Sequence, residues 1–240
     1  MYHFVQYRPD KREQGHMVAV NQPLKALPAF RTVLGVSADP EAFIDQGVEP
    51  LDHIKFLGPM YFDLDGEDIS EVLNQARVLV AELVRYGVDP NLLSIYLSGK
   101  KGVHITIPEK MFGVTQAVHY LPLIWEKFAA KFSGSCIDRG VYSAGKGRMW
   151  RCTQGQRPDT GTYKVQVTNQ ELQTMTLADY SQLVSAPRPD LKIDETLIQP
   201  VPKLVSEFQA VQPLVKAEVR AKKLAAESIT RRLYQEEILE

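Results

Sequence analysis

Two carboxylates stand two residues apart in the segment Y-F-D-L-D-G-E-D, at Asp63 and Asp65. The residues from Pro59 onwards are typical of a β-strand, in which every second side chain points to the same face. Both carboxylates then lie on one face at the carboxyl end of the strand, where they could bind a hard divalent cation such as Mg²⁺ or Mn²⁺. A strand end whose aspartates only cap the following helix is the alternative.

A second cluster, between Leu97 and Ile105, combines glycines, a hydroxyl, lysines and an imidazole in a strand, a tight turn and a second strand. Glycine lets a backbone approach a ligand closely, and N–H, hydroxyl and imidazole groups can donate hydrogen bonds to phosphate oxygens. The candidate phosphate-binding residues are Ser98, Gly99, Lys101, Gly102 and His104. The segment has neither P-loop spacing nor a G-x-G-x-x-G turn, and an ordinary hairpin with solvated lysines is the alternative.

A third cluster begins at Asp138 and is strongly basic. Residues 139–164 contain six cations and one acid, although the whole chain has a net charge of -1. Tyr142, Trp150 and Tyr163 are interleaved with these cations and could stack on bases. The pattern predicts a local nucleic-acid-binding surface, and a solvated edge strand protected by its charges is the alternative.

In combination, the motifs follow the order D-x-D, S-G-x-x-G-x-H, then an aspartate followed by arginines. This arrangement resembles the archaeo-eukaryotic primase superfamily, the family of primase-polymerases, and especially its phage- and plasmid-type members. The resemblance covers residues 60–167, and the segment R-P-D-T-G-T-Y-K-V looks like the sequence that follows the third motif there. It implies an α/β (α+β) fold with a mixed-sheet catalytic core, and transfer of nucleotides from (d)NTPs to a primer, or de novo, on single-stranded DNA.

The resemblance also implies roles for individual residues. Asp63, Asp65 and Asp138 would be the catalytic carboxylates that hold two Mg²⁺ or Mn²⁺ ions. Nucleotide binding would fall to the second motif and two arginines, namely Ser98, Gly99, Lys101, Gly102, His104, Arg148 and Arg151. The candidate template-binding cations are Arg139, Arg157 and Lys164. The expected partners are a single-stranded DNA template, nucleoside triphosphates and a replicative helicase, in the replication of a mobile element or phage.

Two other functions stay open on the residues alone. Carboxylates, a histidine and basic residues can also direct water at a phosphodiester, as in a metal-dependent nuclease or phosphoesterase. A non-catalytic single-strand-binding or replication-initiation protein would need only the basic aromatic stretch. Hydrolysis without nucleotides would indicate the first function, and template binding without synthesis, retained after loss of the three carboxylates, would indicate the second.

The elements that position these residues alternate short apolar runs with helical periods, which predicts a mixed α and β organisation. Strands are expected at residues 59–65, 92–97, 103–107, 139–142, 149–152 and 162–167. Helices are expected at residues 67–86, 115–132 and 176–184, the last opened by a capping box. Prolines between residues 186 and 202 predict a linker. The expected organisation is a catalytic domain at residues 1–186, a linker at 187–202 and a helical tail at 203–240, interrupted at Pro213.

The composition, with 44% hydrophobic and 24% charged residues, is that of a folded water-soluble protein. No apolar run is long enough to span a bilayer, and the first ten residues lack the apolar centre of a signal peptide. These features predict a cytoplasmic protein with no membrane partner, in a bacterial, archaeal or phage-infected cell. Two cysteines, Cys136 and Cys152, are too few for the zinc module of many relatives, so no zinc is expected.

Overall fold

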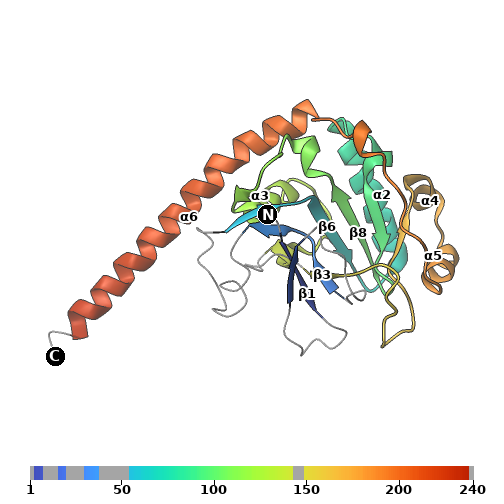
Figure 1. Cartoon of the computed structure of the whole chain (residues 1–240), viewed down its shortest axis with the longest axis horizontal. Coiled ribbons are helices and arrows are strands. Elements are labelled where there is room, and N and C mark those ends of the chain that lie inside the picture. Colours follow the sequence, from blue (N-terminus) through green and yellow to red (C-terminus); the bar gives the residue numbers. More distant parts are fainter. Residues whose placement is uncertain (1–2, 8–15, 20–29, 38–53, 143–148, 238–240) are drawn as a thin grey trace.

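The computed structural model describes residues 3–7, 16–19, 30–37, 54–142 and 149–237. Within them the chain forms a mixed α/β (α+β) fold with two antiparallel sheets and a long C-terminal helix (Figure 1). One sheet has the strand order β11-β7-β8-β6, and the other has the order β10-β3-β1-β4-β5-β9 with β2 paired to β1. The fold class expected from the sequence is therefore confirmed.

The four-stranded sheet carries most of the predicted site residues. It consists of β6 (Met60–Asp65), β7 (Ser94–Leu97), β8 (Gly102–Ile107) and β11 (Val165–Val167). One of its faces is apolar and fully buried, with Phe62, Leu64 and Ile105 among its side chains. Because side chains alternate along a strand, Asp63, Asp65 and His104 lie on the opposite, polar face.

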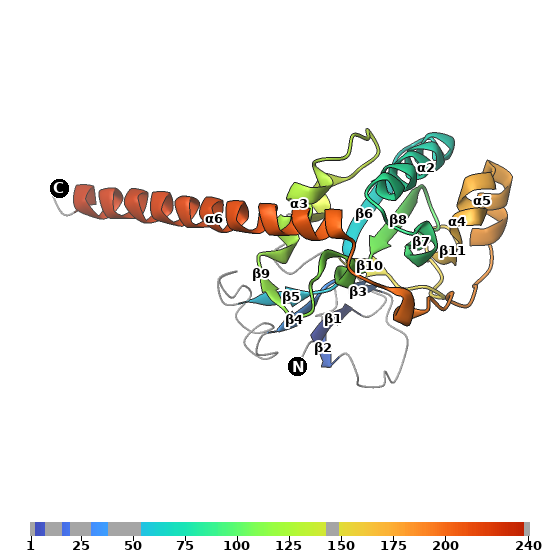
Figure 2. The same ribbon diagram turned by 90° about the horizontal axis from the view of Figure 1, so that it is seen from above.

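Helix α2 (Ile69–Arg85) covers the apolar face of this sheet. Asp68 caps the helix, since its carboxylate accepts from the Ser70 amide at 2.8 Å. The buried stripe of the helix consists of Val72, Leu73, Ala76, Leu79, Val80 and Leu83. Figure 2 shows α2 on the outer side of β6 and β8, with the strands of the other sheet on the opposite side. The polar face of β6 and β8 is thus turned towards the second sheet.

The second sheet contributes a tryptophan to the space between the sheets. Its strands are β1 (His3–Tyr7), β2 (His16–Ala19), β3 (Phe30–Thr32), β4 (Gly35–Ser37), β5 (Lys55–Leu57), β9 (Val118–His119) and β10 (Met149–Arg151). Trp150 on β10 pairs with Arg31 on β3 and contacts the Tyr61 ring edge-on, at 5.6 Å between centroids. Trp150 therefore bridges the two sheets.

The remaining helices and 3₁₀ turns, other than the C-terminal helix, are short. They are α3 (Leu121–Ala129), α4 (Asn169–Thr174), α5 (Leu177–Val184) and the 3₁₀ turns η1 (Pro90–Leu92), η2 (Glu109–Phe112), η3 (Arg139–Tyr142) and η4 (Glu195–Leu197). The capping box expected at the start of α5 is confirmed, because Thr176 and Asp179 exchange side-chain and backbone hydrogen bonds. The described residues contain no helix that is both long and apolar enough to cross a membrane.

Helix α6 (Pro202–Glu237) runs without a break through Pro213, so the expected interruption is wrong. Its first half packs on the body, where Leu204, Val211 and Val215 are buried and the Phe208 ring lies 5.7 Å from that of Trp125. Figures 1 and 2 show its second half projecting away from both sheets. The domain boundaries at 186 and 203 stay a prediction, although this helical segment begins in contact with the core.

Three expected elements differ in the structure. Residues 139–142 form η3 instead of a strand, because the Asp138 side chain accepts from the Gly140 amide at 2.8 Å and starts a turn. Helix α3 begins only at Leu121, since Tyr120 has a left-handed backbone with φ 61° and Val118 already belongs to β9. Strand β11 begins at Val165 and not at residue 162, because the Gly161 amide donates to the Arg157 carbonyl in a turn and Tyr163 then pairs with Gln156 in an isolated bridge.

Candidate functional site

Asp63 and His104 face each other across β6 and β8, as register partners of the two strands. The His104 Nε2 atom lies 3.4 Å from the Asp63 Oδ1 atom, and each side chain is only 10% exposed. The imidazole also stacks on the Trp150 ring, with 4.2 Å between centroids and 23° between planes. Two residues 41 positions apart, from the first and second predicted motifs, are thus brought together and held in one orientation.

Asp138 joins this pair from the other side of β6. The Asp138 amide donates to the Asp63 carbonyl at 2.8 Å, and the Asp65 amide donates to the Cys136 carbonyl at 2.9 Å. These bonds flank an antiparallel bridge between Leu64 and Ile137. Asp138 is therefore the cross-strand neighbour of Asp63, and all three predicted carboxylates lie at one edge of the sheet.

The Asp65 and Asp138 carboxylates each accept a hydrogen bond from a nearby backbone amide. Asp65 accepts from the Gly66 amide at 3.2 Å, Asp138 accepts from the Gly140 amide, and both side chains are exposed. Within the described residues, no three His, Cys, Asp or Glu side chains are gathered as a ready metal site. Carboxylates are the ligands that Mg²⁺ and Mn²⁺ favour, so the chemistry of the three side chains suits such an ion, although their present arrangement does not form a site for it.

The second motif forms the tight turn that joins β7 to β8. The Ser98 hydroxyl accepts from the Gly102 amide at 3.0 Å, and the Ser98 amide donates to the Gly102 carbonyl at 2.9 Å. The chain approaches its neighbours closely at both glycines. A Cβ atom on Gly102 would lie 2.7 Å from the Leu64 carbonyl oxygen, and one on Gly99, where φ is 82°, would lie 2.6 Å from the Tyr163 carbonyl oxygen. Packing of the turn therefore requires both glycines, independently of any ligand.

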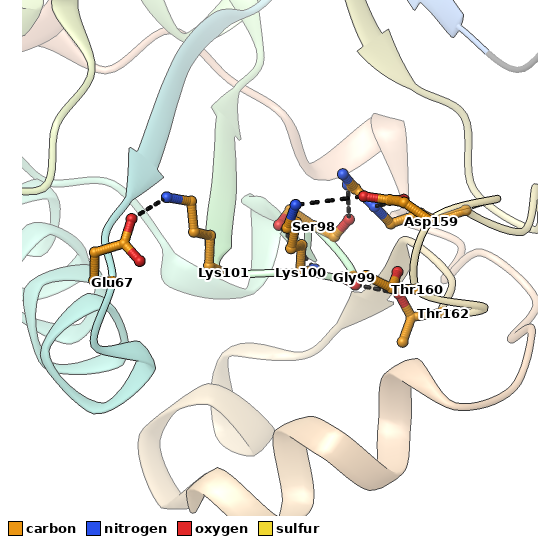
Figure 3. A network of polar contacts seen from close by, with 9 residues as sticks. Glu67, Ser98, Gly99, Lys100, Lys101, Asp159, Thr160 and Thr162 are labelled. Carbon is orange, nitrogen blue, oxygen red and sulfur yellow. Dashed lines mark hydrogen bonds and ion pairs between the residues drawn. The ribbon is translucent and has the colours of Figure 1, made fainter.

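The two lysines of this turn make ion pairs at the surface. Lys101 Nζ lies 2.5 Å from Glu67, and Lys100 Nζ lies 3.4 Å from Asp159 (Figure 3). The Lys101 ammonium group lowers the pKa of Glu67 by hydrogen bonding and by its charge. Exposed pairs of this kind are weak. Both lysines are therefore able to exchange these partners for a ligand phosphate.

The segment R-P-D-T-G-T packs over the same turn. Arg157 donates from Nη1 to the Ser98 carbonyl at 3.3 Å and lies 3.4 Å from Asp159. The Thr162 hydroxyl donates to the Gly99 carbonyl, and Figure 3 shows this threonine beside the turn. Arg157, predicted to bind template, thus also supports the second motif from within the protein.

The predicted basic stretch does not form one exposed surface. Arg139 is exposed, Arg157 is partly buried against the turn, and Lys164 is only 4% exposed. Arg148 lies outside the described residues. Tyr142 and Trp150 are 1% and 7% exposed, so the expectation that they present free faces for base stacking is wrong. Tyr142 instead donates its hydroxyl to the Tyr61 carbonyl, as part of the core between the sheets.

Lys164 occupies the polar face beside β7. Its amine lies 4.5 Å from the centre of the Tyr96 ring and 4.6 Å from that of Trp150, which are cation–π contacts. Burial lowers the pKa of Lys164 to about 7, while the nearby Cys152, Asp63 and Asp190 favour its charged form. The sequence analysis missed Tyr96, although the alternation of Ser94, Ile95, Tyr96 and Leu97 would have placed it on the polar face.

A scan against protein-family models finds no match for the chain, and a search of curated proteins finds none either.

Proposed function

We propose that this protein is a nucleotidyltransferase of the primase-polymerase kind. It would add nucleotides from (d)NTPs to a primer, or start strands de novo, on a single-stranded DNA template. The observation that supports the proposal is the meeting of three motifs at one edge of one sheet. Asp63 contacts His104, Asp138 is hydrogen bonded to the backbone of Asp63, and Asp65 is the register partner of Gly102 in the second motif.

Asp63, Asp65 and Asp138 would hold Mg²⁺ or Mn²⁺, whose chemistry is to activate a 3′-hydroxyl and neutralise charge on the departing pyrophosphate. His104 would bind a phosphate oxygen of the nucleotide. The Asp63 carboxylate and the Trp150 ring already hold its imidazole in place, so little ordering is lost when a ligand binds. The replicative helicase stays a prediction of the family resemblance.

The lysines and Arg157 would bring positive charge to the same edge. Lys101 lies next to Gly102 in sequence, and its carbonyl accepts from the Gly66 amide directly after Asp65, at 3.3 Å. The turn that carries the cations is thus fixed to the strand end that carries the carboxylates. Phosphates placed between the two would be neutralised by ammonium groups on one side and by metal ions on the other.

The experiment is incubation with single-stranded template, labelled nucleotides and Mg²⁺ or Mn²⁺, with and without an annealed primer. The proposal expects longer products that depend on template sequence. Shortened template without nucleotides would show a nuclease instead, and bound but unchanged template would show a passive single-strand-binding protein.

A matched pair of variants ties the activity to the site. Asp63→Asn should abolish incorporation, because it removes a carboxylate without changing the size of the side chain. Asp89→Asn is the control, since Asp89 is the exposed N-cap of η1 and asparagine caps as well as aspartate does. Incorporation at the wild-type rate by Asp63→Asn would refute the assignment.

A further inference from the structure

One wall of the cavity between the two sheets is a loop. The cavity has a volume of about 700 Å³ and lies between the polar face of β7, β8 and β11 and the strands β3 and β10. Residues 186–200, which we call the strap, connect α5 to α6, and Figure 2 shows the loop between these helices. The strap residues in the cavity lining are Asp190, Leu191, Ile193, Glu195 and Ile198.

The strap adds little to the core of the protein. Its side chains are all exposed or half-buried, and its regular structure is limited to the short 3₁₀ turn η4. Pro187, Pro189 and Pro200 lack the amide proton that a strand or helix would need. A segment with few buried side chains and little regular structure can open at a low free-energy cost while the rest of the protein stays folded.

Side chains hold the middle of the strap against the body. The Gln166 side chain, on β11, accepts from the Leu191 amide at 2.9 Å, and the Thr153 hydroxyl donates to the Asp190 carboxylate at 2.8 Å. Two ion pairs join the strap to the body as well, Arg188 with Glu171 at 2.8 Å and Lys110 with Glu195 at 3.4 Å. Each of these contacts is weak by itself, so they can break and form again.

Both ends of the strap are fixed to the body. Before the strap, the Val184 carbonyl accepts from the Tyr163 amide at 2.8 Å, and the Val184 side chain is buried. After it, the Val201 amide donates to the Met111 carbonyl at 2.9 Å, and Leu204 is fully buried at the start of α6. A strap that opens in the middle would therefore return to the same position.

We propose that the strap is a movable wall, which opens between its fixed ends and sets how large a molecule can enter the cavity. The bond between Gln166 and the Leu191 amide favours the closed position, because the Gln166 side chain is only 3% exposed and belongs to the rigid sheet. The cavity has the volume of a small-molecule pocket, and a wall that closes after entry would keep water out. This inference rests on the contacts of the strap and not on the proposed function.

Cys152 is a native probe of entry, because it lines the cavity and is half-buried. Cys136, the other cysteine of the chain, is buried and does not belong to the lining. The test measures the rates at which iodoacetamide and a bulky fluorescein maleimide label each cysteine at one fixed pH, by mass spectrometry of the two peptides. Relative to the protein unfolded in urea, the folded wild type should slow the maleimide at Cys152 more than iodoacetamide.

Gln166→Met removes the acceptor of the Leu191 amide and keeps the length of the side chain. It should raise the rate of maleimide labelling at Cys152 about fivefold, as expected for loss of one hydrogen bond, and the iodoacetamide rate by less. Gln199→Met is the matched control. The Gln199 side chain donates to the Thr196 carbonyl at 3.2 Å, so the bond that is lost lies within the strap. Both rates should then equal those of the wild type.

Cys136 separates opening of the strap from unfolding of the whole protein. Its labelling rate should be the same in wild type and Gln166→Met, because Cys136 stays buried when only the strap moves. An unchanged maleimide rate at Cys152 in Gln166→Met, an equal increase in Gln199→Met, or a parallel increase at Cys136 would overturn the proposal.

Hydrogen exchange of single amides, followed by NMR, tests where the opening ends. After correction for intrinsic rates, the Leu191 amide should exchange faster than the Val201 amide, which stays bonded to Met111 when the strap opens. Equal exchange of the two amides would mean that the strap and the start of α6 open together, and would refute a strap that moves between fixed ends.

Discussion

Replacing Lys164 by methionine should remove a pH dependence of stability that the buried amine imposes on the whole protein. In the folded state burial lowers the pKa of this group to about 7, whereas in the unfolded chain it is about 10.4. Between these values the unfolded chain binds more protons than the folded one, so the free energy of unfolding rises with pH. Below pH 7 the penalty for burying the charge is fully present, and it declines as the pH increases.

The size of the effect follows from these two pKa values. Proton linkage gives a slope of at most about 1.4 kcal/mol per pH unit for a single group. Between pH 7 and pH 9 the free energy of unfolding should therefore rise by about 2 kcal/mol because of Lys164 alone. Methionine has a side chain of similar length and no charge, so the variant should lack this contribution while keeping contact with Tyr96 and Trp150.

Urea denaturation of wild type and Lys164→Met at pH 7, 8 and 9 measures the effect. The Cys152 thiol, whose pKa burial raises, titrates in both proteins and largely cancels in the comparison. Lys164→Met should be more stable than wild type at pH 7, and the difference should shrink by about 2 kcal/mol by pH 9. Lys203→Met is the control, because the Lys203 amine also lies over a tyrosine ring, 3.9 Å from the centre of Tyr86, but Lys203 is exposed. This variant should show the wild-type pH dependence. A constant difference between wild type and Lys164→Met across this range would refute the reasoning.

Three other perturbations probe the turn, the histidine and the exposed cation. Gly99→Ala should lower the free energy of unfolding by about 2 kcal/mol or more in urea denaturation, whereas Gly155→Ala, where a Cβ atom would lie 3.8 Å from its nearest neighbour, should be close to neutral. His104→Ala should weaken nucleotide binding more than template binding in parallel titrations, and equal losses would contradict its phosphate role. Arg139→Gln should flatten the log-log salt dependence of single-stranded DNA binding by about 0.7, and an unchanged slope would exclude a phosphate contact there.

Local pattern was sufficient to predict much of the fold. The helix at α2 follows from its apolar stripe and the glycine after it, and the strands around Asp63 and His104 follow from short apolar runs. The predicted ends of helices and strands were wrong where the backbone conformation of one residue decides them. Tyr120, with its left-handed φ just before α3, is an example. The 3₁₀ turn after Asp138 was predicted as a strand for a similar reason. The Asp138 side chain accepts a hydrogen bond from the backbone amide two residues later, and this bond favours a turn over an extended conformation.

The candidate site depended on information that periodicity does not contain. Spacing places Asp63 and Asp65 on one face, but the contact with His104 requires that β6 pair with β8 in one particular register. A cavity of about 700 Å³ between the polar face of the four-stranded sheet and the strands β3 and β10 was beyond prediction, because it requires the second sheet to lie opposite the first. Lys164 illustrates the consequence: charge alone suggested an exposed residue, whereas its neighbours in space are two aromatic rings.

The buried polar groups are distributed unevenly over the two faces of the four-stranded sheet. In the described part of the chain the buried polar or charged residues outside the aromatic core are Thr32, Asp63, His104, Lys164 and Gln166. Four of these stand on one face of the four-stranded sheet, and Thr32 lies on β3 in the wall of the cavity opposite. Burying such groups lowers stability unless they are paired. Asp63 pairs with His104, and the Gln166 side chain accepts from the Leu191 amide at 2.9 Å. The opposite face of the same strands, under α2, is apolar. The proposed function gives this polarity a role, because polar groups that are already ordered on one face can receive a charged ligand with little reorganisation.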